Sequence, residues 1–173
     1  MKLVQVPPRP NWQSIVESQG FDFHTVDEKE YWVDHRAYCF DAAEVEMIEK
    51  STIELQRLCL QAVKHVIEQN RFKDLRIAEA IVPLIVESWQ NDEPTIYARF
   101  DLSFDGTSPP KMLEYNADTP TGLLESAVIQ WYWLEDQKKN FGFEVDQFNF
   151  IHEQLVESWK WYRTFARTSE DEV

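Results

Sequence analysis

The sequence predicts an α+β fold that is rich in helices and contains an antiparallel β-hairpin or a small sheet. Apolar residues recur at helical spacing through long segments on both sides of the chain's centre, whereas residues 96–104 alternate strictly between apolar and polar side chains. The first pattern is typical of amphipathic helices, and the second is typical of a strand with one buried face. The 173 residues suit a single domain, 1–173, that is large enough to bury a core.

The helices are expected in order along the chain, over residues 11–19, 41–70, 83–90, from 120 onward, and 147–165. Gly20 suits the left-handed position that closes the first helix. Asp41 and Glu44 form the carboxylate variant of a capping box at the start of the second. Pro83 stands at the start of the third helix, where a proline is tolerated.

The hairpin is expected from strand 96–104, turn 105–110 and strand 111–117. The turn contains Asp105-Gly106 and two consecutive prolines. Pairing of position 104 with position 111 would place Asp101 opposite Glu114, with side chains about 5 Å apart. The same register places Arg99 opposite Asn116, so that all four side chains share one face.

Those four side chains suggest a site for a hard cation. Two facing carboxylates, Asp101 and Glu114, repel each other unless a cation lies between them, and the carboxamide of Asn116 adds a neutral oxygen. Mg²⁺ is commonly held by one or two carboxylates together with water and substrate phosphates. Arg99 could bind a phosphate through two hydrogen bonds. The same residues could equally form the solvated face of an ordinary hairpin, and the pattern alone leaves both interpretations open.

A second candidate site follows the hairpin. Thr119 and Thr121 lie beside an expected helix N-terminus, where free N–H groups and the helix dipole favour a carboxylate or a phosphate. Ordinary capping of the helix explains the same residues. Glu125 could face the same cleft, or it could be a surface residue that complements the helix dipole.

Charge and composition exclude several classes of function. A net charge of −14 and a pI near 4.6 argue against nucleic acid or an anionic membrane as a partner. No apolar run reaches the roughly 18 residues of a membrane span. The four histidines lack the spacing of zinc ligands, and no glycine-rich phosphate loop occurs. Cys39 and Cys59 are expected to be free thiols in a reducing cytosol, so a cytoplasmic protein is expected.

Several blocks of sequence carry a resemblance to a known family. They are RFD at 99–101, LEYNADTPT at 113–121, ESA at 125–127 and WLEDQ at 133–137, with RPNW at 9–12 and GFDFHT at 20–25 nearer the N-terminus. In these blocks the chain resembles the glutathionylspermidine synthase family in its stand-alone synthetase form. The resemblance covers nearly the whole chain.

The resemblance implies an ATP-grasp-type fold and an amide-forming activity. Members of the family join the glycine carboxylate of glutathione to an amine of spermidine, through an acyl-phosphate made from ATP. In stand-alone homologues the acid and the amine can differ. The implied partners are therefore small molecules, namely a peptide or amino-acid carboxylate and a polyamine or other amine, with Mg²⁺ as cofactor and ATP as co-substrate.

The resemblance also implies roles for individual residues. The positions of Asp101, Glu114 and Asn116 match the Mg²⁺ ligands that hold the ATP phosphates. Arg99 matches the catalytic residue that stabilises the transferring phosphoryl group and the acyl-phosphate. Thr119 and Thr121 match positions that bind the peptide substrate, where the family often has serines.

Length is the main departure from the family. Family synthetases are longer, and the ATP-grasp half that holds the nucleotide lies downstream of the matching residues. The chain is therefore expected to represent the N-terminal, pre-ATP-grasp portion and to be inactive by itself. Two rival interpretations remain: a non-catalytic module that binds a substrate or a partner, and a purely structural domain in which the four polar residues only face water.

Overall fold

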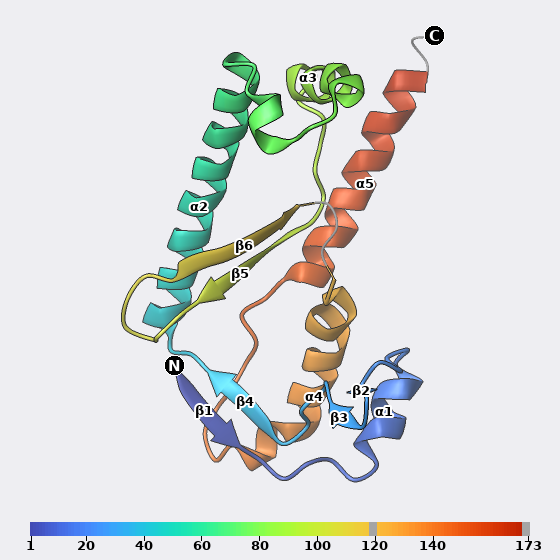
Figure 1. Cartoon of the computed structure of the whole chain (residues 1–173). Helices are drawn as coiled ribbons and strands as arrows, with labels where there is room; N and C mark the ends of the chain where they lie inside the picture. The colour runs from blue at the N-terminus through green and yellow to red at the C-terminus, as the bar shows by residue number, and fades with distance from the viewer. Residues whose placement is uncertain (118–120, 171–173) are drawn as a thin grey trace. The chain divides into compact units, whose positions relative to one another are not determined.

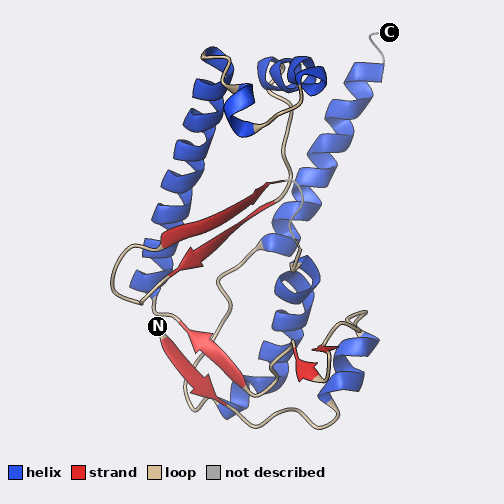
Figure 2. Cartoon of the chain, in the orientation of Figure 1, coloured by secondary structure: helices blue, strands red, loops and turns tan. Residues whose placement is uncertain are grey.

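The computed structural model describes residues 1–117 and 121–170, and Figure 1 follows the chain through them. These residues form helices and small antiparallel sheets (Figure 2), which confirms the α+β class predicted from the sequence. The chain divides into two compact units, Met1–Val45 together with Thr119–Val173, and Glu46–Asp118. Among the described helices, none combines the length and the apolar character that a membrane span requires.

Two short antiparallel strand pairs lie in the first unit. Strand β1 (Lys2–Gln5) pairs with β4 (Arg36–Cys39). Strand β2 (Thr25–Val26) pairs with β3 (Lys29–Glu30). The two residues between β2 and β3 have φ angles of 48° and 63°. Two consecutive left-handed residues are the geometry of a tight hairpin turn, so this turn follows the right-handed twist of its strands.

In the first unit, the N-terminal helix lies where the sequence predicts it, whereas the last helix begins later than predicted. Helix α1 (Trp12–Ser18) forms where it is expected, and Gly20 has a φ of +88°. The π-helical segment η3 (Glu125–Ile129) continues into α4 (Gln130–Gln137) and the short 3₁₀ turn η4 (Lys138–Asn140). The expected helix start at residue 120 lies outside the described residues, and the described helix begins at residue 123.

The last helix begins later than the sequence predicts. Helix α5 (Ile151–Glu170) starts four residues after the expected position 147. The side chain of Asp146 accepts a hydrogen bond from the N–H of Gln147 at 2.9 Å, which gives that N–H a partner outside a helix. Residues 144–150, before α5, form no regular secondary structure.

The hydrophobic core lies mainly in the first unit. Its buried side chains form two clusters, one of Val6, Trp133, Leu134 and Phe141, and the other of Val16, Phe21 and Ile129. A buried ion pair accompanies them, since Arg9 Nη2 lies 2.8 Å from Asp34 Oδ1. The backbone N–H of Arg9 also donates to Asp34, at 2.7 Å, and Trp133 donates through its ring N–H to the Asp34 carbonyl at 2.9 Å. These bonds hold three segments together: the N-terminal segment at Arg9, the loop before β4 at Asp34, and helix α4 at Trp133.

The second unit contains the hairpin and all of the long helix after Val45. Helix α2 (Ala42–Glu68) begins with the predicted capping box, because the Glu44 N–H donates to Asp41 Oδ1 at 2.9 Å and the Asp41 N–H donates to Glu44 Oε2 at 3.0 Å. The following residues form two 3₁₀ turns, η1 (Phe72–Leu75) and η2 (Glu79–Ile81), and then α3 (Val82–Gln90), with Pro83 in its first turn as predicted. Strands β5 (Ala98–Ser103) and β6 (Lys111–Ala117) complete the unit.

Few hydrophobic side chains of the second unit are buried. Phe72 is the one large apolar side chain among its described residues that is buried, and α2 buries none. The expected buried face of the first hairpin strand is only partly covered, because Phe100 and Leu102 remain half-buried. Within the described residues β5 and β6 pair only with each other, so the hairpin belongs to no larger sheet that could cover this face.

Candidate functional site

The register of the hairpin brings the predicted polar residues together. In strands β5 and β6, Asp101 is paired with Glu114, and Arg99 is paired with Asn116. Both pairs are those expected from the sequence. Directly opposed residues in an antiparallel pair point to the same side, and so do residues two apart on one strand. The four side chains therefore share one face of the hairpin.

The pairing that was expected to set this register is wrong by one residue. Ser103, rather than residue 104, pairs with Lys111, and Leu102 pairs with Met112. A β-bulge between Asp101 and Leu102 leaves Leu113 without a partner on β5 and shifts the register. The bulge lies on the turn side of the four residues, so it changes their neighbours without separating them.

The opposite face of the hairpin is aromatic. Phe100 and Tyr115 are cross-strand partners, and their rings stack with centroids 4.3 Å apart and planes at 17°. The Tyr115 hydroxyl forms a hydrogen bond with Gln56 Oε1 on α2 at 2.6 Å. This bond ties the hairpin to the long helix of the same unit and fixes which face carries the polar residues.

Arg99 and Asp101 form an ion pair on the polar face. Arg99 Nε donates to Asp101 Oδ1 at 2.7 Å, and Nη2 donates to Oδ2 at 3.3 Å. The hydrogen bond to Asp101 raises the pKa of the Arg99 guanidinium, and the negative charges of Asp101 and Glu114 act in the same direction. The side chains of Arg99 and Asp101 are 35% and 38% exposed, so the face is open to solvent.

The residues present fit a magnesium ion that is shared with a phosphate. Asp101, Glu114 and Asn116 offer only oxygen ligands for a cation, which is the donor type that Mg²⁺ prefers. In the part of the chain that the structure describes, no three His, Cys, Asp or Glu side chains gather into a complete metal cage. A pair of carboxylates is nevertheless the usual protein share of a Mg²⁺ site in which substrate phosphates supply the remaining ligands.

Within the part of the chain that the structure describes, the side-chain amide of Asn116 has an unsatisfied hydrogen-bond donor. Its Nδ2 is buried and has no hydrogen-bond partner among the described residues. A buried donor without an acceptor costs about 1–3 kcal/mol. An acceptor such as a phosphate oxygen would remove this cost. The polar face thus combines acceptors for a cation with an unsatisfied donor.

The predicted substrate-binding threonines, Thr119 and Thr121, follow the hairpin in the sequence. Thr119 lies outside the described residues. Thr121 is exposed and belongs to the first unit, just before Gly122, whose φ is +85°. Within the described residues, the hairpin brings together Arg99, Asp101, Glu114 and Asn116.

Sequence reasoning missed two contacts of candidate residues. The Arg99–Asp101 ion pair could have been predicted from the sequence, because oppositely charged residues two apart on a strand face the same side. The hydrogen bond from the Tyr31 hydroxyl to Glu125 Oε1, at 3.0 Å, joins residues 94 positions apart. No local pattern in the sequence indicates that contact.

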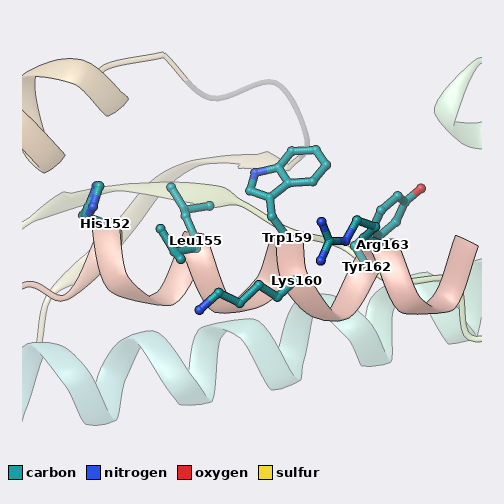
Figure 3. Close-up of a pocket in the computed structure, with 7 residues that line it drawn as sticks. His152, Leu155, Trp159, Lys160, Tyr162 and Arg163 are labelled. Carbon is teal, nitrogen blue, oxygen red and sulfur yellow. The ribbon is translucent and has the colours of Figure 1, made fainter.

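A shallow hollow beside α5 is not a second candidate site. Figure 3 shows its lining residues, His152, Leu155, Val156, Trp159, Lys160, Tyr162 and Arg163, with a volume of about 640 Å³. All seven residues belong to one helix. Ligand pockets bury most of the surface of the ligand, and side chains of a single helix do not enclose a ligand in this way. The hollow includes none of the predicted site residues and is part of an exposed helix surface.

Comparisons with known proteins agree on one family. Residues 3–172 match the family model described as glutathionylspermidine synthase preATP-grasp. The chain is 41% identical over 161 residues to a Haemophilus influenzae protein provisionally named an acid–amine ligase, covering 91% of this chain and 40% of that protein. It is 35% identical over 78 residues to the trypanothione synthetase of Crithidia fasciculata, covering 44% and 12%. The chain thus spans less than half the length of these curated relatives.

Proposed function

Because the chain belongs to the glutathionylspermidine synthase pre-ATP-grasp family, we propose that it is the N-terminal portion of an ATP- and Mg²⁺-dependent ligase that joins a carboxylate to an amine. The observation that carries the proposal is the register of the hairpin, which groups Arg99, Asp101, Glu114 and Asn116 on one polar face. These residue types suit phosphoryl transfer, in which catalysis consists mainly of positioning and charge neutralisation.

The charges of the four residues explain the need for a metal. Arg99 contributes one positive charge, and Asp101 and Glu114 contribute two negative charges, so the face by itself repels a phosphate. When bound, Mg²⁺ would reverse the sign of the local field and neutralise phosphate charge. Asp101, Glu114 and Asn116 would hold the ion, and Arg99 would hydrogen-bond the transferring phosphoryl group.

Arg99 must leave Asp101 to take this role. Both side chains are more than one-third exposed, and solvent screening leaves an exposed ion pair only weakly stabilising. The exchange of a carboxylate partner for a phosphate therefore costs little. In the absence of nucleotide, the ion pair keeps the guanidinium in place beside the metal ligands.

The chemical steps need no side-chain nucleophile from this chain. A carboxylate oxygen of the acid substrate attacks the γ-phosphorus of ATP, ADP leaves, and an acyl-phosphate forms. The amine then attacks the acyl carbon, phosphate leaves, and the amine gives up a proton as the amide forms. Arg99 would stabilise the phosphoryl charge in both steps.

The substrates of this chain follow from its proposed class. The acid is a peptide or amino-acid carboxylate, for which Thr119 and Thr121 supply hydroxyl groups near a helix start. The amine is a polyamine or another alkylamine. The free thiols of Cys39 and Cys59 suit a reducing cytoplasm, and the net charge of −14 disfavours nucleic acid as a ligand.

We propose that residues 1–173 alone are inactive, since they match only 40% of the length of the Haemophilus influenzae relative. A second candidate function is a non-catalytic module that binds a substrate or a partner. The exposed apolar residues of the second unit, such as Ile53 at 64% and Leu113 at 70%, favour that candidate.

One experiment separates the two functions. ADP release is measured for the product of the complete reading frame, against panels of peptides and amines. ADP release that a particular acid–amine pair stimulates supports the ligase. A protein that binds ATP yet releases no additional ADP with any pair is instead a binding module.

A further inference from the structure

A pair of exposed aromatic rings lies in the first unit, outside the hairpin site. Phe23 is 56% exposed and Tyr31 is 51% exposed, and both flank the small β2–β3 hairpin. Their ring centroids are 5.3 Å apart with planes at 64°. Tyr31 also contacts the buried ring of Phe21, at 6.2 Å, so its ring is supported from below by the core. Figure 1 shows this hairpin beside α1.

A carboxylate is held at the edge of these rings. The Tyr31 hydroxyl donates to Glu125 Oε1 at 3.0 Å. Among the described residues no Lys, Arg or His lies within ion-pairing distance of Glu125. Glu125 is therefore a fixed negative charge without a protein cation.

Glu125 stands at the first position of the π-helical segment η3. Such segments are rare and occur frequently at functional sites, because they re-aim side chains away from the ordinary helical positions. The segment follows directly after Thr121 and Gly122, the stretch assigned to the substrate above. Three independent features thus meet at one place: exposed rings, a fixed carboxylate and a π-helix.

The charge of the surrounding segment selects the kind of ligand. Residues 21–32 carry four acidic side chains, Asp22, Asp27, Glu28 and Glu30, against one lysine. The nearby His24 is engaged by Glu17, at 3.0 Å from Nε2 to Oε1. An acidic surround with exposed aromatic faces attracts organic cations and repels carboxylates and phosphates.

We propose that Glu125, Tyr31 and Phe23 bind the ammonium group of an alkylamine. Glu125 accepts a hydrogen bond from the ammonium group, and the rings contact the ammonium and the first methylene groups. The claim that this amine is the substrate rests on the ligase function proposed above. The claim that the site binds an alkylammonium ion stands independently of that function, because it needs neither ATP nor turnover.

The test uses the full chain of residues 1–173 and butylammonium chloride as the probe. Aromatic and methyl signals are followed by NMR at constant ionic strength, with sodium chloride as the reference titration. We expect saturable shifts centred on Phe23 and Tyr31. Replacement Glu125→Gln keeps the size and the acceptor oxygen, removes the charge, and should weaken binding about fivefold to tenfold.

Glu153→Gln provides the matched control. Glu153 is an exposed glutamate of the same unit, on the first turn of α5, and loses the same charge. Tyr31→Phe keeps the ring and removes the hydroxyl that holds Glu125, so a smaller loss of about twofold is expected. Equal weakening by Glu125→Gln and Glu153→Gln, or ring signals that sodium shifts as strongly as butylammonium, overturns the site. A site that binds the amine in a protein without ligase activity would leave this inference standing and contradict only the proposed function.

Discussion

Arg99 and Asp101 lie two residues apart on strand β5, and Arg99 Nε donates to Asp101 Oδ1 at 2.7 Å. The residue proposed to neutralise a phosphoryl group is therefore hydrogen-bonded to a residue proposed to hold the metal. If this face binds Mg²⁺ and phosphate as proposed, we expect the two binding events to be coupled, because a cation that binds Asp101 would release the guanidinium for the phosphate. The ion pair predicts that metal binding at Asp101 precedes phosphate binding at Arg99.

Replacement Arg99→Lys tests the two-donor geometry of the guanidinium. The lysine keeps the charge but loses the planar pair of donors, so kcat/KM for ADP release by the complete reading-frame product should fall about a hundredfold. The measurement uses the acid–amine pair that stimulates the wild type most. Arg57→Lys on the exposed surface of α2 is the control and should leave the rate unchanged. A wild-type rate for Arg99→Lys would remove Arg99 from the catalytic machinery.

Replacement Asp34→Asn tests the buried ion pair of the first unit. The Asp34 side chain is 1% exposed and pairs with Arg9 at 2.8 Å. Loss of this carboxylate leaves the buried guanidinium with only the half-exposed carboxylate of Asp136, so the free energy of unfolding should fall by about 3–5 kcal/mol in a urea titration. Asp136→Asn provides the comparison, because Asp136 bonds the same arginine at 2.9 Å but is 51% exposed. The expected loss there is below about 1 kcal/mol, and equal losses would contradict the distinction between buried and exposed partners.

The turn of the hairpin predicts a pH dependence. Hydrogen bonds from the backbone N–H groups of Ser108 and Thr107, and from the Thr107 hydroxyl, lower the pKa of Asp105 from 3.8 to about 2. Because the folded value lies below the unfolded value, these bonds stabilise the turn above pH 3.8, and the contribution is lost as the pH falls through about 2.

Carboxyl ¹³C chemical shifts of Asp105, followed by NMR against pH, check this value. Replacement Thr107→Val removes the hydroxyl donor but keeps the backbone N–H, so the pKa should rise part of the way back to 3.8. An Asp105 pKa at or above 3.8 in the wild type would show that the turn lacks these hydrogen bonds in solution.

The pairing of the candidate residues could be predicted because side chains on a strand alternate with a period of two. Once 96–104 and 111–117 are recognised as strands, any register that keeps both apolar sets on one face places Arg99, Asp101, Glu114 and Asn116 together on the other. Capping of α2 was predictable for a similar reason, because Asp41 and Glu44 satisfy each other's backbone N–H groups locally. Both features, the shared face of the hairpin residues and the capping box of α2, depend on residues that are close in the sequence.

Contacts between distant segments could not be predicted in this way. The bulge at Leu113 depends on how the strand ends meet the turn, and no glycine or proline in β6 marks it. The Tyr31–Glu125 hydrogen bond depends on tertiary packing across 94 positions. The exposure of Phe100 and Leu102 depends on how many elements cover the hairpin, and alternation carries no information about that.

A titration of the ¹⁵N-labelled chain with Mn²⁺, as a paramagnetic substitute for Mg²⁺, tests whether the polar face of the hairpin binds the metal. Line broadening should centre on Asp101, Glu114 and Asn116 at low metal ratios. In Asp101→Asn this broadening should disappear, whereas in Glu93→Gln, an exposed control in the same unit, it should persist. With diamagnetic Mg²⁺ the Arg99 Nε–H signal should shift as its bond to Asp101 breaks. Broadening spread evenly over the acidic surface, and unchanged in Asp101→Asn, would contradict the assignment of this hairpin as a metal and phosphate site.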